Sequence, residues 1–228
     1  MQPEPLRSLQ DQANPGHTAL VVVDVQKDYC AEDGLLAIRS GQDMSPIRAA
    51  MPRLNRLIQD ARDRGVLVVW VRAATTLRAL QPNHRAVRDQ GSGLLAVEGS
   101  DGASFDEGVL PPLPGDIVVT KRNYDGFHQT PLDTMLRAQE IQTLVMTGFT
   151  TNVCVESTAR HGYFKGYYIV LASDCSAAPD PTEHESAVRN ISRYFGKVAT
   201  GQEISSAWAL VTSTVPTVSE VGTGRLSP

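Results

Sequence analysis

The stretch Leu144-Val-Met-Thr-Gly-Phe-Thr-Thr-Asn-Val-Cys154-Val-Glu-Ser-Thr158 passes from an apolar run, through a polar turn, into a helical pattern. Gly148 ends the apolar run, and Cys154 falls in the first turn of the expected helix. The stretch therefore predicts a strand, a turn and a helix, with a thiol at the corner between them.

A cysteine at this corner has a chemical advantage. The first N–H groups of a helix lack intrahelical partners and carry the positive end of the helix dipole. Sulfur placed there is driven towards the nucleophilic thiolate, and the same N–H groups can bind an oxyanion. The alternative for Cys154 is a buried thiol that packs as a small apolar group, as most cysteines in reduced proteins do.

The rest of the chain alternates between strand and helix patterns. Residues 19–23 form a continuous apolar run, which is typical of a strand buried on both faces of a parallel sheet. Ser45 and Pro46 begin a helix that Gly65 ends, and Thr182-Glu-His-Glu185 fits a capping box for a later helix. Further strands are expected at residues 66–71, 117–119, 143–146, 167–172 and near 198, and further helices at 130–138 and around 208. This alternation predicts a three-layer α/β/α sandwich with a mainly parallel, doubly wound central sheet.

The chain shows no internal repeat and no linker between domains. We expect one domain over residues 18–211, preceded by a polar arm (1–17) that lies over the surface or on a partner subunit. Residues 72–115 show little periodicity, and irregular segments of this length usually form a lid or a subunit contact. Residues 212–228 are rich in Ser, Thr, Gly and Pro, which predicts a loose tail.

The composition limits the possible partners and compartments. The 228 residues are 41% hydrophobic and 20% charged, with a net charge of −4, which argues against nucleic acid or an anionic membrane as the main partner. No apolar run is long enough to span a bilayer, and the N-terminus lacks the apolar core of a signal peptide. Three widely spaced cysteines suggest neither a disulfide framework nor a zinc site, so we expect a cytoplasmic protein.

Three chemically matched residues follow the predicted strands. Asp24, Lys121 and Cys154 each come just after a different strand, and α/β folds bind ligands beyond the carboxyl ends of their strands. Asp24 can accept the thiol proton, while the charge of Lys121 keeps Asp24 ionised and stabilises the thiolate. Taken singly, Asp24 can instead cap a turn and Lys121 can be a solvated charge at a strand end.

These residues lie in motifs that resemble the isochorismatase-like cysteine hydrolases. The motifs are Val21-Val-Val-Asp24-Val-Gln26, Lys121 and the Thr-Gly-x-x-Thr-x-x-Cys-Val pattern that ends at Cys154, and the similarity covers about residues 18–210. The resemblance implies a catalytic triad of Asp24, Lys121 and Cys154. It also implies an oxyanion hole formed by the backbone N–H groups of Thr150 and Cys154, with a cis peptide bond between Phe149 and Thr150.

Within this family, the sequence is most similar to the ureidoacrylate, biuret and N-carbamoyl amidohydrolase branch. Nicotinamidases carry an Asp-x-His…His metal site after the second strand, whereas residues 70–84 contain only His84. True isochorismatases lack the nucleophilic cysteine. Lys121-Arg-Asn-Tyr124-Asp-Gly-Phe127-His-Gln-Thr130-Pro-Leu132 looks closest to the ureidoacrylate enzymes. The resemblance implies a metal-free, cofactor-free amidohydrolase that cleaves a C–N bond of a small ureido, carbamoyl or amide compound through a thioester and releases ammonia.

Substrate contacts are less closely defined by the sequence. Tyr124 and Phe127 either wall the pocket or pack in the core, and Gln26 either orients Asp24 or contacts substrate. Arg72 is the favoured arginine for a substrate carboxylate because it ends a strand, and Arg78, Arg85 and Arg88 are the others. The remaining residues of interest have expected surface or packing roles: His84, His128, His161, His184, Cys30 and Cys175.

Three alternatives remain. The same triad serves a hydrolase of a simple carboxamide or a vinyl ether, because it handles any reactive carbonyl. A degenerate scaffold would be expected to have lost a triad residue, and a nucleotide-binding domain needs a glycine-rich loop after the first strand, which Asp24-Val-Gln-Lys is not. Because relatives commonly form dimers or tetramers, we expect a homodimer or homotetramer.

Overall fold

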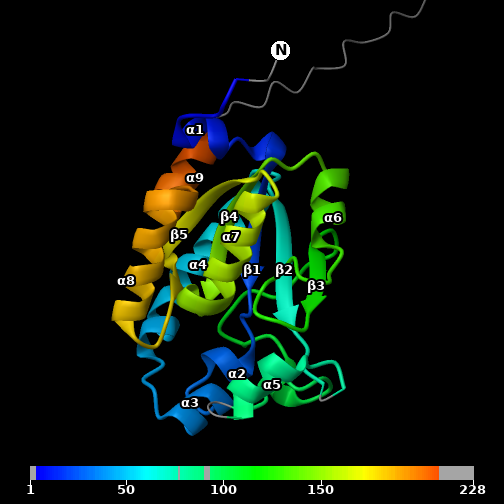
Figure 1. The fold of residues 1–228 in the computed structure, drawn as a ribbon. Coiled ribbons are helices and arrows are strands. Elements are labelled where there is room, and N and C mark those ends of the chain that lie inside the picture. The colour runs from blue at the N-terminus through cyan, green and yellow to red at the C-terminus, as the bar shows by residue number, and fades with distance from the viewer. Residues whose placement is uncertain (1–3, 77, 90–92, 211–228) are drawn as a thin grey trace, which may run out of the picture.

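The computed structural model describes residues 4–76, 78–89 and 93–210, and within them six strands form one sheet (Figure 1). The strand order is β3-β2-β1-β4-β5-β6, and every neighbouring pair is parallel. The strands are β1 Thr18–Val23, β2 Leu67–Ala73, β3 Ile117–Lys121, β4 Thr143–Phe149, β5 Tyr168–Ala177 and β6 Lys197–Ala199. The chain builds outward from β1 to β3 on one side and from β4 to β6 on the other, so the direction of winding reverses between β1 and β4.

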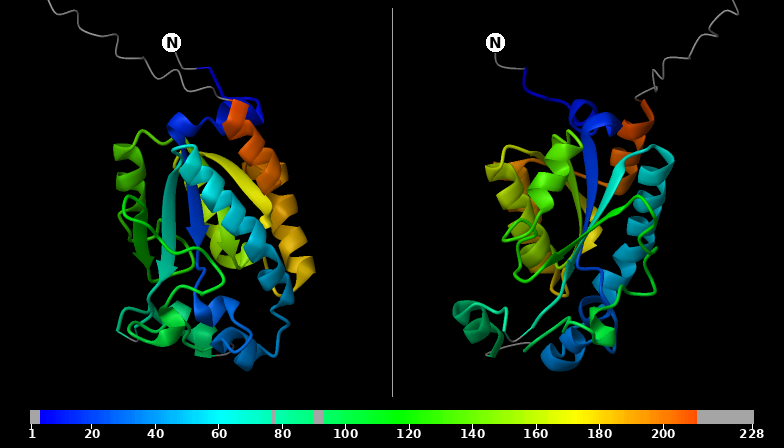
Figure 2. Two further views of the ribbon diagram at one scale, coloured as in Figure 1. Left: turned by 180° about the vertical axis from the view of Figure 1, so that it is seen from behind. Right: turned by 90° about the vertical axis from the view of Figure 1, so that its right-hand side faces the viewer.

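Helices cover both faces of the sheet (Figure 2). One face carries α4 (Ser45–Asp63) and α9 (Gly201–Leu210), which pack against each other. The other carries α6 (Leu132–Ala138), α7 (Glu156–Phe164) and α8 (Pro181–Asn190), whose last turn continues as a π-helical turn to Phe195. The predicted three-layer, doubly wound α/β/α sandwich is confirmed.

The apolar spacing of α4 explains its place against the sheet. Its buried side chains recur at helical intervals and belong to the core on that face: Ile47, Ala50, Met51, Leu54, Leu57, Ile58 and Ala61. Pro46 lies in the first turn, where its missing N–H is not needed, and Gly65 follows the helix with φ +68°.

The predicted capping box of α8 is wrong. Asp180 is the N-cap, and its side chain accepts a hydrogen bond from the N–H of Thr182 at 2.8 Å. The helix therefore begins with Pro181 as its first residue, before the Ser/Thr-x-x-Glu pattern that suggested a start at Thr182.

The segment expected to be irregular contains short helices and covers the carboxyl edge of the sheet. It includes α5 (Pro82–Asp89) and a 3₁₀ turn (Asp101–Ala103), and it runs beside α2 (Lys27–Cys30) and α3 (Leu35–Ser40) beneath the strand ends in Figure 1. Backbone bridges join Gln26 to Phe105 and Thr75 to Val97. These helices of four to eight residues are too short to produce a clear periodic pattern.

The N-terminal arm contacts its own chain from Leu6 onward. The helix α1 (Leu9–Gln12) has a capping box between Ser8 and Asp11, and it contacts α9. The N–H of Leu6 donates to the Tyr168 hydroxyl at 3.0 Å. The predicted tail at 212–228 lies outside the described residues.

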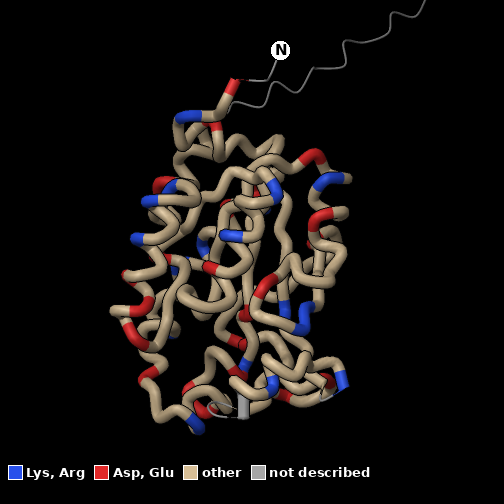
Figure 3. The backbone as a smooth tube through the Cα atoms, viewed as in Figure 1, with Lys and Arg blue, Asp and Glu red and all other residues tan. Residues whose placement is uncertain are grey.

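Lys and Arg positions are interspersed with Asp and Glu positions along the backbone in the view of Figure 3. Among the described residues, no helix is both long and apolar enough to cross a membrane.

Candidate active site

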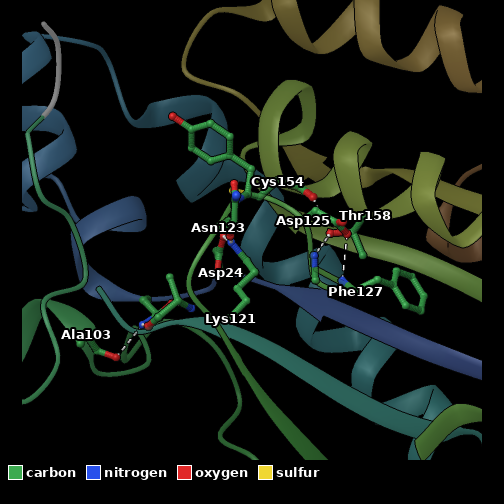
Figure 4. Close-up of polar contacts among 12 residues, drawn as sticks. Asp24, Ala103, Lys121, Asn123, Asp125, Phe127, Cys154 and Thr158 are labelled. Atoms are coloured by element: carbon green, nitrogen blue, oxygen red, sulfur yellow. Dashed lines mark hydrogen bonds and ion pairs between the residues drawn. The ribbon is translucent and has the colours of Figure 1, made fainter. Parts of the chain in front are cut away.

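Asp24, Lys121 and Cys154 meet at the carboxyl edge of the sheet (Figure 4). The Nζ atom of Lys121 lies 2.7 Å from Asp24 Oδ2 and 3.5 Å from Cys154 Sγ. All three side chains are buried, with residue exposures of 0% for Asp24, 1% for Lys121 and 4% for Cys154. The three residues whose predicted positions follow separate strands thus form one cluster at the point where the winding reverses.

Asp24 is held by the turn that ends β1. Its φ of +50° is a conformation that Asp tolerates better than most residues, and its N–H donates to the carbonyl of Val71 at 2.8 Å. Asp24 Oδ2 contacts Lys121, whereas Oδ1 has no hydrogen-bond donor among the described residues. The carboxylate therefore keeps one oxygen available to accept a proton.

Lys121 distributes its ammonium over three acceptors. Besides Asp24 and Cys154, Nζ donates to the carbonyl of Asn123 at 2.9 Å. Burial by itself would lower the pKa of Lys121, but the negative charges of Asp24 and Cys154 raise that pKa above its ordinary value. Lys121 is therefore positively charged at neutral pH and favours the thiolate form of the neighbouring sulfur.

Cys154 lies in a π-helical turn (Thr151–Val155) that leads directly into α7. Thr158 Oγ1 donates to the carbonyl of Cys154 at 2.8 Å and accepts from the N–H of Gly126 at 2.9 Å. One buried hydroxyl thus joins the cysteine turn to the loop that follows Lys121 (Figure 4). Sequence reasoning missed this role, although the four-residue spacing from Cys154 places Thr158 on the same side of a helix.

The cis peptide bond between Phe149 and Thr150 is present, as the resemblance implies. Thr150 and Cys154 both line the cavity at this site. That their backbone N–H groups form the oxyanion hole stays a prediction.

The cavity beside Cys154 has a volume of about 180 Å³. This is smaller than the range of about 300–1,000 Å³ typical of sites for drug-sized molecules, so it suits a small ligand. Its lining residues are Tyr29, Leu36, Gln42, Leu95, Tyr124, Thr150, Asn152, Val153, Cys154, Pro179 and Glu183. Leu95 comes from the segment at 72–115, which therefore contributes to the wall of its own chain's site.

A larger cavity of about 680 Å³ lies between α2 and residues 100–108. None of the triad residues lines it. The chemistry points to the smaller cavity, because a ligand must reach the buried sulfur.

Comparison with known proteins agrees with this geometry. Residues 18–203 match the family model described as the isochorismatase domain. The chain belongs to the isochorismatase family.

The similar proteins include a curated relative and solved structures. The ureidoacrylate amidohydrolase RutB of Methylorubrum extorquens is 41% identical over 198 residues, which cover 80% of this chain and 79% of the relative. A cysteine hydrolase from Pseudomonas syringae pv. phaseolicola has a TM-score of 0.77 at 28% identity, covering 92% of this chain and 99% of that one. The N-carbamoylsarcosine amidase of Thermoplasma acidophilum has a TM-score of 0.65 at 26% identity, covering 81% and 96%. The chain is therefore a hydrolase of the isochorismatase-like cysteine hydrolase family.

Of the four residues expected to contact substrate in this isochorismatase-family chain, Tyr124 lines the cavity. Gln26 lies elsewhere: its Nε2 donates to the carbonyls of Ala73 at 2.9 Å and Ala103 at 2.7 Å, and its Oε1 accepts from Ala73 N–H at 2.7 Å (Figure 4). Its amide therefore holds β2 and the 100–108 segment together, and the structure does not support substrate binding by Gln26.

Arg72 and Phe127 also lie away from the cavity. The Arg72 guanidinium stacks 5.8 Å from the centre of the Phe105 ring, which packs against the core on the α4 face, whereas Cys154 belongs to the core on the other face. Phe127 is 5% exposed and packs against the rings of His161 and Tyr167. Arg72 is not among the residues that line the cavity. The alternation of side chains along β2 places it on the α4 face, which its position at the strand end alone does not reveal.

The remaining cysteines fit the packing roles expected for them. Cys30 and Cys175 are buried, and burial raises the pKa of each thiol above its ordinary value. Their sulfurs are therefore poor nucleophiles.

The four histidines singled out in the sequence, His84, His128, His161 and His184, have protein partners. His84 packs against the Tyr124 ring, His161 pairs with Asp125, and His184 Nδ1 lies 2.9 Å from Thr151 Oγ1. The described part of the chain contains no group of three or more His, Cys, Asp or Glu residues arranged to hold a metal ion.

Proposed function

We propose that this protein is a cysteine amidohydrolase that cleaves a C–N bond of a small ureido, carbamoyl or amide compound through a thioester and releases ammonia. The observation that carries the proposal is the buried cluster of Asp24, Lys121 and Cys154 beside a cavity of about 180 Å³. The relative named ureidoacrylate amidohydrolase, at 41% identity, supports the same class of bond.

The reaction begins with attack of the Cys154 sulfur on the substrate carbonyl carbon, after its proton has passed to Asp24. The backbone N–H groups of Thr150 and Cys154 bind the oxyanion that forms. Asp24 returns the proton to the departing amine as the C–N bond breaks, which leaves a thioester.

Hydrolysis of the thioester completes the cycle. A water molecule loses a proton to Asp24 and attacks the thioester carbonyl, and the proton then returns to the sulfur as the C–S bond breaks. Lys121 stays charged throughout, because it stabilises both the carboxylate and the thiolate. The sequence of steps needs no metal or cofactor, since the thiolate, the carboxylate and the backbone donors supply all of its chemistry.

The wider setting is also part of this proposal. We infer a small-molecule substrate, a homodimer or homotetramer, and a cytoplasmic location. The three cysteines, all of which are described, form no disulfide, which agrees with a reducing compartment.

Ammonia release by the purified protein tests the reaction class. The panel contains ureidoacrylate, biuret, N-carbamoyl amino acids, nicotinamide and simple amides, each with and without EDTA. We expect EDTA-resistant turnover of a ureido or carbamoyl compound, with a loss of at least about a thousandfold in Cys154→Ala and in Asp24→Asn, since both act in the chemical step.

Turnover that survives in Cys154→Ala would sink the thioester mechanism. Trapping offers a direct check, because acid quenching of the wild type during turnover should leave an acyl mass on the peptide that contains Cys154. Cys175→Ala is the matched control, since that thiol is buried outside the cavity and its loss should leave turnover and trapping intact.

A further inference from the structure

The wall of the cavity next to Cys154 contains a carboxylate. Glu183 lies in the first turns of α8, lines the cavity together with Asn152, and is exposed, which places it at the mouth. Of the described residues that line this cavity, Glu183 is the acidic one, and none is an arginine or a lysine. Lys121 is 1% exposed and is already engaged by Asp24, Asn123 and Cys154.

The Glu183 carboxylate sets the orientation of the Asn152 amide. Asn152 Nδ2 donates to Glu183 Oε2 at 2.8 Å. The amide oxygen of Asn152 is buried and has no hydrogen-bond donor among the described residues. A buried acceptor without a donor costs free energy, so a bound N–H group that reaches it would be favoured.

The two residues therefore present acceptors and negative charge to whatever occupies the cavity. A ligand with N–H groups at the end away from the scissile carbonyl can donate to the Glu183 carboxylate and to the Asn152 amide oxygen. A ligand carboxylate at the same place would face the like charge of Glu183, and one of the two N–H donors of Asn152 would already be engaged by Glu183.

We propose that Glu183 and Asn152 select substrates whose distal end is uncharged or cationic and rich in N–H groups, such as a terminal amide or a second ureido group, over substrates that end in a carboxylate. This rests on the proposed function for its bond class and goes further by naming the distal chemistry. The preference separates this chain from its relatives named for ureidoacrylate, a compound that ends in a carboxylate.

Alkylation of Cys154 tests the charge of the wall without any substrate. Iodoacetamide and iodoacetate react with a thiolate in the same way and differ in charge, so the ratio of their rates at Cys154, read by peptide mass spectrometry, reports the local potential. We expect Glu183→Gln to raise the iodoacetate-to-iodoacetamide rate ratio by about threefold or more at low ionic strength. Added salt should bring the ratios of the variant and the wild type closer together.

Glu185→Gln is the matched control. Glu185 is an exposed carboxylate on the same helix, but it does not line the cavity. We expect it to leave the ratio near the wild-type value. A ratio that does not move in Glu183→Gln, or that moves equally in both variants, would overturn the proposal.

A pair of substrates tests the same preference in turnover. N-carbamoylglycinamide and N-carbamoylglycine differ in the distal group alone, and we expect the amide to have a kcat/KM at least about tenfold higher, mostly through KM. Glu183→Gln should reduce this ratio, and Glu185→Gln should not. Faster turnover of the carboxylate compound overturns the specificity proposal and leaves the amidohydrolase function standing. If no panel compound is turned over, the proposed function fails, and the alkylation ratio still decides the charge of the wall.

Discussion

At the scale of single residues, the central feature is a buried ion pair whose lysine also contacts the sulfur of Cys154. Asp24 and Lys121 are 2.7 Å apart and almost fully buried. Removing one member of such a pair leaves an uncompensated charge, whereas replacing both by neutral groups can leave stability nearly unchanged. Stability and catalysis can therefore be separated by comparing single and double variants.

We predict that Lys121→Met destabilises the protein by about 3–5 kcal/mol, because it leaves the Asp24 carboxylate buried alone. Adding Asp24→Asn should recover most of that loss, while the double variant stays inactive. Urea denaturation with an activity assay on the same samples measures both. A double variant no more stable than Lys121→Met would show that the ion pair contributes little to the destabilisation.

The raised pKa of Lys121 determines the pH range over which the charge of Lys121 stabilises the folded protein. A group whose pKa is raised on folding contributes its full stabilisation below its unfolded pKa, here about 10.4, and loses it as pH rises through the folded value. The contribution of Lys121 should therefore be constant between pH 6 and 9, and a fall in activity within that range belongs to another group.

At the scale of secondary structure, the close contact between β1 and β4 brings Asp24 and Cys154 together. Gly148 near the end of β4 pairs with Val23, the residue before Asp24. A Cβ atom at Gly148 would lie 2.1 Å from the carbonyl oxygen of Val23, and the φ of Gly148 is +107°. Only a residue without a side chain lets the two strands meet at this point.

Gly148→Ala should lower the free energy of unfolding for two separate reasons. Overpacking against β1 costs about 1–3 kcal/mol, and the positive φ adds about 1–2 kcal/mol. Gly166→Ala is the matched control, because Gly166 has φ +88° but open space around its Cβ position, so it should lose stability for the second reason alone. Urea midpoints and kcat of both variants are the measurement, and equal losses would show that the contact with Val23 has no effect.

At the scale of the whole molecule, one carboxylate joins a helix layer to the sheet. Asp116, just before β3, accepts hydrogen bonds from Arg62 of α4 at 2.8 Å and from the Trp70 indole of β2 at 2.9 Å. It also accepts from the N–H of Leu113 at 2.9 Å. Burial alone would raise the pKa of Asp116, but these hydrogen bonds and the Arg62 charge lower it below its ordinary value.

The lowered pKa of Asp116 predicts that the stability of the protein depends on pH. Because the pKa of Asp116 is lowered on folding, its contribution is present above the unfolded value, about 3.9, and is lost as pH falls through the folded value. We expect Asp116→Asn to be less stable at pH 7 by about 1–3 kcal/mol, with the difference shrinking below about pH 4. Urea denaturation of both proteins from pH 7 to pH 3 measures it, and a constant difference would rule out a role for the charge.

Much of the architecture followed from the order of patterns along the chain. Unbroken apolar runs alternating with amphipathic helices can be buried in few ways, and a parallel doubly wound sheet is the common one. The positions of Asp24, Lys121 and Cys154 after separate strands then implied a shared edge. Their proximity in the structure agrees with that inference.

The roles of Gln26, Arg72 and Phe127 did not follow in the same way. Each has a side chain able to bind substrate. Gln26 and Phe127 lie within six positions of Asp24 and Lys121, respectively, and Arg72 lies next to the last residue of β2. Their partners come from residues far along the chain: Ala103 for Gln26, Phe105 for Arg72 and Tyr167 for Phe127. A local pattern carries no information about contacts of that range.

The sequence by itself determined the sheet, its winding and the shared edge at which Asp24, Lys121 and Cys154 lie, because strand period and strand ends are local properties. The tertiary structure alone decided which side chains face the cavity. Glu183 lines the cavity from a helix about thirty residues after Cys154 in the sequence. These two outcomes have one physical cause. The periodic pattern of a strand or helix is set by residues that are close together in the chain, whereas the wall of a binding site is assembled from distant segments that only the packed core brings together.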